Sequence, residues 1–199
     1  EAFDRQFLGD FTQGRFEEAV ALLRQSFDVD PLNTLPRYQL IWPLLALGEL
    51  DAAEREARAV IEMEPGFPFI HGTLGDIYAL RGDVDALRKL ARDSPSDDSR
   101  RYMVGLEAAL SGDVDGLAKA SDELISRCQL EEYSCVLAAA ALHAFADQSD
   151  SFFALLDRLS AEPRYSPSLA DPFTIKYWHD PRFIAHLEQY GMSLPSPVS

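Results

Sequence analysis

The sequence predicts an all-α fold, a right-handed solenoid of four to five helical hairpins with a capping helix at its C-terminal end. Two observations indicate this fold. Glycines that begin similar short segments recur with spacings of 34, 34 and 30 residues, at Gly14, Gly48, Gly82 and Gly112. Hydrophobic residues make up 47% of the 199 residues, which is enough for a continuous core between stacked helices.

Each recurring segment has the residue types that a turn between two helices needs. The first helix of a hairpin is expected to end at its glycine, because a left-handed residue there meets no Cβ penalty. An acidic residue close behind suits the start of the second helix, where a carboxylate can accept from free N–H groups. Pro31 and Pro65, each 17 residues after a glycine, are expected to stop the second helix.

Two positions of each second helix are predicted to face the first helix. The apolar residue two places after the glycine is expected to pack back on the first helix, at Phe16, Leu50, Val84 and Val114. The small or apolar residue five places after the glycine is expected at the close helix crossing, at Ala19, Ala53, Leu87 and Leu117.

These segments resemble tetratricopeptide repeats, which have a period of 34 residues. Residues 14–31 and 48–65 are similar to the second helix and closing proline of that family, and Leu74, Tyr78 and Gly82 match its first-helix pattern. The resemblance covers residues 1–128. The third and fourth units lack the closing proline. Pro43 falls inside a first helix, which it should kink or split at a cost of about 3 kcal/mol.

The whole chain is predicted to be one repeat domain. The expected units are residues 1–33, 34–67, 68–97, 98–130 and 131–163, with a capping tail at 164–199. The fifth unit is degenerate, and Asp147 stands where its glycine would be. In the tail, Asp180 suits the cap of a helix that begins at Pro181, and Gly191 suits its end.

The tail resembles the segment that ends tetratricopeptide regions in bacterial signalling proteins. The residues that carry this resemblance are Asp180, Pro181, Arg182 and Phe183, followed by a short helix up to Gly191. Such regions are fused to membrane-anchored winged-helix regulators, nucleotide cyclases or kinases. The resemblance implies that residues 1–199 are the C-terminal region of a longer signalling or regulatory protein. It also implies a non-catalytic role as an interaction or sensory module.

Charge and hydropathy narrow the expected partners. The net charge is −15, from 18 basic and 33 acidic residues, so this region is not expected to bind nucleic acid. No apolar run approaches the roughly 18–20 residues that span a bilayer, so membrane insertion by this region is not expected. The expected partner is a protein or peptide, and the oligomeric state stays open.

No catalytic residues, metal site or cofactor are predicted, because the sequence contains no phosphate loop, nucleophile elbow or zincin motif. His179 and Asp180 are similar to the paired ligands of metal-dependent phosphohydrolases, and a small hydrolase-like domain is one alternative. The further ligands that such enzymes need are missing, and His186 lies about 10 Å along a helix from His179. A purely structural oligomerisation array is the other alternative. His71 and His143 are expected to be exposed or hydrogen-bonded.

The two cysteines allow two interpretations. Cys128 is predicted near the end of one helix and Cys135 near the start of the next, close enough for a disulfide. The alternative is two buried thiols that act as small hydrophobic residues. A disulfide implies an oxidising compartment. Together with the resemblance to membrane-anchored regulators, this favours a periplasmic over a cytoplasmic location.

The first helices of stacked hairpins line a concave face, which in this family usually binds a peptide. The family's exposed first-helix positions correspond here to Tyr38, Trp42, Phe69, Asp76, Tyr102 and Leu106. Tyr38 and Trp42 are expected to anchor the partner, because they lie four residues apart on one helix face and are residue types enriched at interface hot spots. The alternative is that several of these side chains pack against the tail or a neighbouring hairpin.

Overall fold

The computed structural model describes residues 14–127, 132–159 and 172–189. In these ranges the regular elements are ten α-helices and one 3-10 helix, and there is no strand. They are α2 (Phe16–Val29), α3 (Thr34–Ala46), α4 (Leu50–Met63), α5 (Ile70–Arg81), α6 (Val84–Asp93), α7 (Asp97–Ser111), α8 (Val114–Ser126), α9 (Glu132–Phe145), α10 (Ser149–Leu159), η1 (Ile175–Tyr177) and α11 (Pro181–Glu188). The predicted all-α class is confirmed.

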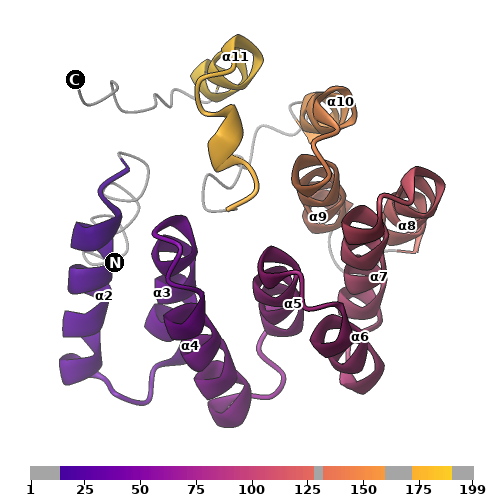
Figure 1. Cartoon of the computed structure of the whole chain (residues 1–199). Coiled ribbons are helices and arrows are strands. Elements are labelled where there is room, and N and C mark those ends of the chain that lie inside the picture. Colours follow the sequence, from indigo (N-terminus) through magenta and orange to yellow (C-terminus); the bar gives the residue numbers. More distant parts are fainter. Residues whose placement is uncertain (1–13, 128–131, 160–171, 190–199) are drawn as a thin grey trace.

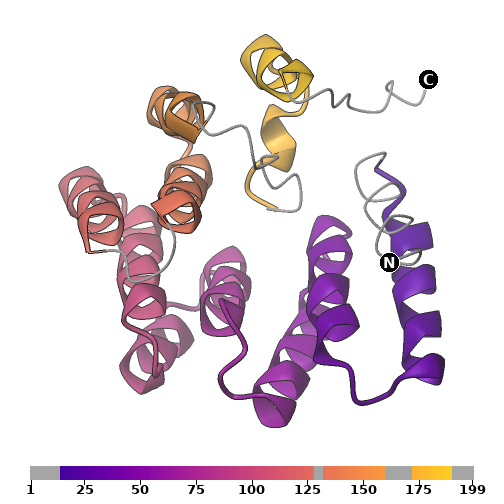
Figure 2. The same ribbon diagram turned by 180° about the vertical axis from the view of Figure 1, so that it is seen from behind.

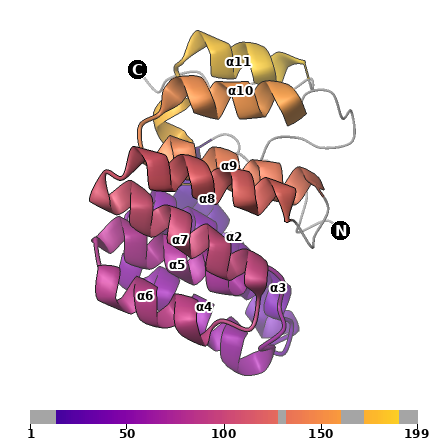
Figure 3. The same cartoon turned by 90° about the vertical axis from the view of Figure 1, so that its right-hand side faces the viewer.

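Consecutive helices pack in pairs, α3 with α4, α5 with α6, α7 with α8 and α9 with α10. The pairs are arranged in an arc in which α3, α5, α7 and α9 lie on the inner side (Figure 1, and from behind in Figure 2). A side view shows the helices stacked in layers, with α10 and α11 at one end (Figure 3). This is the helical-repeat solenoid that the glycine period predicts. Within the described residues, no helix has the length and hydropathy of a membrane span.

The hairpin corners explain the glycine period. The backbone φ angles of Gly14, Gly48, Gly82 and Gly112 are 70, 74, 68 and 71°, in the left-handed region that glycine adopts without a Cβ penalty. Asp147 has a φ of 58° and occupies the same place between α9 and α10. At the last four corners, the residue after the left-handed one donates its N–H to a carbonyl five residues earlier, at 2.8–2.9 Å. These are Schellman motifs, so the prediction that Asp147 replaces a corner glycine is confirmed.

Replacing Asp147 with glycine is expected to raise the free energy of unfolding by about 0.5–1 kcal/mol, because glycine meets no Cβ penalty at this corner. The ion pair between Asp147 and Lys176 is lost, but the Asp147 side chain is mostly exposed and such pairs contribute little. Urea denaturation measures the change. Asp147→Ala is the matched control, since it loses the same ion pair but keeps a Cβ, and it should not stabilise the protein. A glycine variant less stable than wild type would contradict this explanation.

Of the two positions predicted to pack against the first helix, the one five places after each glycine is buried in all four units. The residues at the helix crossings, Ala19, Ala53, Leu87 and Leu117, are at most 1% exposed. The prediction for the residue two places after the glycine is wrong at Val114, which is 61% exposed. Val114 is the first residue of α8, and burial of the α8 face begins one turn later, at Leu117.

Pro31 and Pro65 act as predicted, and of the two effects predicted for Pro43 the structure excludes the split. Helix α2 ends at Val29, just before Pro31, and α4 ends at Met63, just before Pro65. Pro43 does not split α3, which continues through it to Ala46. Pro43 stands in the last turns of α3 and is itself buried, and its carbonyl still accepts the N–H of Leu47 at 3.0 Å. The missing N–H therefore affects one hydrogen bond near the end of the helix.

The C-terminal tail forms the predicted cap. The Asp180 carboxylate accepts the Arg182 N–H at 2.9 Å, and Pro181 is the first residue of α11. The Tyr177 ring stacks on Phe152 of α10, with ring centroids 4.7 Å apart. Trp178 then contacts Phe16 of α2, with ring centroids 5.8 Å apart. Through these ring contacts the tail connects the last hairpin with the first described helix and closes the arc.

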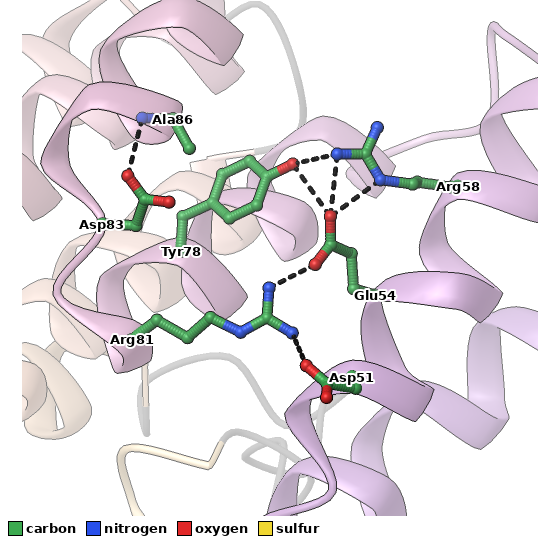
Figure 4. Close-up of polar contacts among 7 residues, drawn as sticks. All are labelled: Asp51, Glu54, Arg58, Tyr78, Arg81, Asp83 and Ala86. Atoms are coloured by element: carbon green, nitrogen blue, oxygen red, sulfur yellow. Dashed lines mark hydrogen bonds and ion pairs between the residues drawn. The ribbon is translucent and has the colours of Figure 1, made fainter.

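A group of charged residues ties α4 to α5 (Figure 4). The Glu54 carboxylate accepts from Arg58 at 2.7 Å and is also paired with Arg81, which reaches Asp51 at 2.5 Å. Arg58 donates to the Tyr78 hydroxyl at 2.6 Å. Burial raises the pKa of Glu54, but the hydrogen bonds from Arg81 and Arg58 outweigh it and hold this pKa below its usual value. The group therefore favours ionised Glu54 in the folded state.

Glu54→Gln is expected to lower the free energy of unfolding at pH 7 by about 1 kcal/mol, because one charge of a partly exposed network is removed. The folded-state pKa is lowered, so this contribution is present above the unfolded-state pKa of about 4.3 and is lost as the pH falls through the folded-state value. Denaturation of wild type and variant between pH 7 and 3 measures the difference. Glu62→Gln, an exposed position on the same helix outside the network, is the control. A difference that stays constant down to pH 3 would contradict the assignment.

Candidate functional site

A cavity of about 530 Å³ opens on the inner side of the arc. Its lining comes from α3, the α4–α5 connection, α5, the α6–α7 connection, the start of α7, one residue of α8, and α9. On this inner side α5 packs on α7 and α7 on α9, whereas α3 packs mainly on its neighbours α2 and α4. The cavity therefore lies between α3, which does not pack closely on the next inner helix, and the group of α5, α7 and α9, which do. It belongs to the face that the repeat pattern predicts as concave.

Five of the six residues singled out from the sequence lie together in this lining: Tyr38, Trp42, Phe69, Asp76 and Tyr102. Leu106 does not reach it and is 0% exposed. Beside it, α9 approaches α7 closely, so that a Cβ on Gly105 would lie 2.4 Å from a methyl carbon of Leu142. Leu106 is thus a core residue of α7.

One wall of the cavity is aromatic. The rings of Tyr38 and Trp42 are in edge-to-face contact with centroids 5.7 Å apart, and the Tyr38 ring is 4.9 Å from that of Phe67. Phe67 was not among the residues singled out from the sequence, because it lies in the α4–α5 connection rather than on a first helix. A signal for it was present in residues 65–69, where two prolines alternate with glycine and two phenylalanines.

Phe69 has an unusual backbone conformation at the rim of the cavity. Its φ is 66°, in the left-handed region, which costs a non-glycine residue roughly 1–2 kcal/mol. The Phe69 side chain is 47% exposed, so burial of this ring does not repay that cost. Strain of this kind is concentrated at binding and catalytic sites. The backbone of Phe69 therefore supports a functional role for this part of the fold.

The polar groups of the cavity include two buried carboxylates. Asp76 is 5% exposed and accepts the Tyr102 hydroxyl at 2.7 Å. Asp98 is 8% exposed and forms an ion pair with Arg101 at 2.8 Å, but Arg101 is not itself part of the lining. His71 also lines the cavity, and no hydrogen bond to its two buried ring nitrogens is found within the described ranges. This differs from the expected exposed or hydrogen-bonded state.

Two other histidines and several arginines outside the cavity are hydrogen-bonded, buried or paired with carboxylates. His143 lies 2.7 Å from Gln148 and 3.2 Å from Ser121, as expected for a hydrogen-bonded histidine. Burial lowers the pKa of His186. Three arginines outside the cavity are paired with carboxylates, Arg81 with Glu54, Arg88 with Glu107 and Arg100 with Asp97.

The alternative site around His179 has no set of ligands in the described structure. His179 is exposed, and Asp180 is engaged in capping α11 and in an ion pair with Arg182 at 2.9 Å. In residues 14–127, 132–159 and 172–189, no group of three or more potential metal ligands is found. Cys135 is buried, lines the cavity and is disulfide-bonded. Cys128 lies outside the described residues, so its pairing with Cys135 stays a prediction.

Comparison with known proteins supports the repeat interpretation for one part of the chain. Residues 10–68 match the family model described as tetratricopeptide repeat. No curated protein and no solved structure matches the chain significantly. The matched segment contains α2, α3 and α4, and with them Tyr38, Trp42 and Phe67 of the cavity wall. The match supports a tetratricopeptide domain, and repeats of this family generally mediate protein–protein interaction.

Proposed function

We propose that this region is a non-catalytic interaction or sensory module of a larger bacterial signalling or regulatory protein, and that it binds a peptide or protein segment on its concave face. The observation that carries the proposal is the cavity of about 530 Å³ between the inner helices, with its aromatic wall. Tyr and Trp are enriched at interface hot spots because they bury large rigid surfaces. Tyr38 and Trp42 provide such surfaces here.

The surroundings of the cavity support a macromolecular partner. Phe69 exposes 47% of its surface at the rim, and Leu35, one turn before Tyr38 on α3, exposes 44%. Phe69 belongs to the lining and Leu35 does not, so the exposed apolar surface continues along α3 beyond the cavity itself. The signalling context rests on the resemblance of Asp180, Pro181, Arg182 and Phe183 to the tail of bacterial regulators.

Selection from a library of displayed random peptides tests the proposal. We expect enriched peptides to bind the wild-type chain and to lose binding to Ala138→Phe, which fills the cavity from α9. Ala118→Phe, on an exposed position of α8 away from the cavity, is the matched control and should bind normally. The proposal is overturned if no peptide is enriched, or if the enriched peptides bind wild type and Ala138→Phe equally. Calorimetry on purified protein gives the affinities.

A further inference from the structure

The permanently charged residues among the described lining of the cavity all carry the same sign. They are Asp76 and Asp98, and no lysine or arginine is present among these lining residues. The chain as a whole adds to this negative potential, with a net charge of −15. A ligand that enters the cavity therefore meets carboxylates and a field that favours positive charge.

Both carboxylates are nearly buried, but the ion pair with Arg101 offsets the charge of Asp98, so Asp76 is the carboxylate that acts on a ligand. Charges interact more strongly where water is excluded, because the local dielectric is lower than in bulk water. The Tyr102 hydroxyl donates to Asp76 at 2.7 Å and so orients this carboxylate. Asp76 is thus held in place in the lining of the cavity.

The aromatic side chains fit the same kind of ligand. Tyr38, Trp42, Phe67, Phe69 and Tyr102 all contribute to the lining. The faces of such rings attract ammonium and guanidinium groups. The methylene stem of a lysine or arginine also packs favourably on apolar surface while its charged end reaches a polar group. The rings can contact the methylene stem of a long cationic side chain, and a carboxylate can bind its charged end.

We propose that the cavity binds a lysine or arginine side chain of the partner segment, with its stem against the aromatic wall and its charged group at Asp76. This inference rests on the proposed function and specifies the chemistry of the partner. The partner segment is basic and carries apolar residues beside the cation, which contact Phe69 at the rim of the cavity and Leu35 beyond it. An acidic segment is disfavoured, because the described lining offers no permanent positive charge to it.

The test uses a peptide enriched on the wild-type chain and a second peptide in which its lysine or arginine is replaced by norleucine. Norleucine keeps an unbranched stem and removes the charge. We expect the norleucine peptide to bind at least about tenfold more weakly by calorimetry, within the range of a desolvated cation–π contact and a charge pair. Equal affinity of the two peptides overturns the inference. The proposed function still stands in that case if Ala138→Phe abolishes binding.

Asp76→Asn tests the charge partner, because the amide oxygen can still accept the Tyr102 hydroxyl. We expect this variant to bind the cationic peptide about five- to tenfold more weakly and to bind the norleucine peptide with unchanged affinity. Asp122→Asn, on an exposed position of α8 outside the lining, makes the same change in net charge and should alter neither affinity. Equal effects of the two variants on the cationic peptide overturn the role of Asp76.

Two further measurements keep the inference falsifiable if Asp76→Asn folds poorly. Raising the NaCl concentration should lower the affinity for the cationic peptide and leave the affinity for the norleucine peptide unchanged, because screening acts on charge pairs. An identical salt response of both peptides overturns the inference. In the second measurement, n-butylammonium is added as a competitor. Displacement of the peptide by an equal concentration of this free amine would show that the cavity recognises a small amine, and would overturn the assignment to a peptide side chain.

Discussion

Trp178→Ala is expected to lower the free energy of unfolding by about 3–5 kcal/mol, the usual range for removing a buried tryptophan. The Trp178 side chain is buried between the tail and Phe16 of α2. Its loss leaves a cavity at the place where the two ends of the array meet. Urea denaturation followed by circular dichroism measures the change.

Trp178→Phe is the matched control for this prediction. It keeps an aromatic ring in the same place, and it removes an indole N–H that is buried without a hydrogen-bond partner among the described residues. We therefore expect it to cost less than half as much as alanine. The double variant that combines Trp178→Ala with Phe16→Ala should show a coupling energy of about 0.5–1.5 kcal/mol between the two positions. Strictly additive effects, or a loss below about 1 kcal/mol for Trp178→Ala, would show that the tail does not hold α2.

Trp42→Ala is expected to weaken binding of a concave-face peptide by about 2 kcal/mol or more, which is roughly 30-fold, if Trp42 is an interface hot spot. Trp42 is only partly buried, lines the cavity and has its ring edge-to-face with Tyr38. The helical content should stay near that of wild type. Calorimetry with an enriched peptide and thermal melting of the same protein measure the two effects.

The two measurements distinguish a contact residue from a packing residue. If Trp42 belongs to the core, alanine should cost about 3–5 kcal/mol of stability instead. Unchanged affinity together with a large drop in melting temperature would contradict the role of Trp42 in binding. Trp42→Phe serves as the control, since it preserves a ring against Tyr38 and should retain most of the affinity.

The sequence predicts the fold well because its main signal is local. A corner glycine predicts the left-handed conformation of its own backbone. Asp147 also takes this conformation, as its position in the repeat predicts. The capping role of Asp180 is local in the same sense. The wrong prediction at Val114 concerns where burial begins along α8, which depends on the neighbouring helix rather than on the repeat.

The candidate site is predicted less completely because it depends on contacts between distant segments. The repeat pattern brings Tyr38, Trp42, Phe69, Asp76 and Tyr102 to one cavity. It does not show that Leu106 is buried in the core, although Gly105 beside it is a residue type that permits the close approach of α9. Phe67 and the buried ring nitrogens of His71 become visible only when the α4–α5 connection is placed against α3.

The contact between Phe16 and Trp178 changes how the array is expected to lose its structure. In an open repeat array, stability is a sum of terms between neighbours, and the terminal repeats fray before the middle ones. Here fraying from either end must break the same aromatic contact, so the two termini of the described array are energetically one unit. Hydrogen exchange in α2 and α11 should therefore report a shared opening event, as in a closed loop rather than a linear chain.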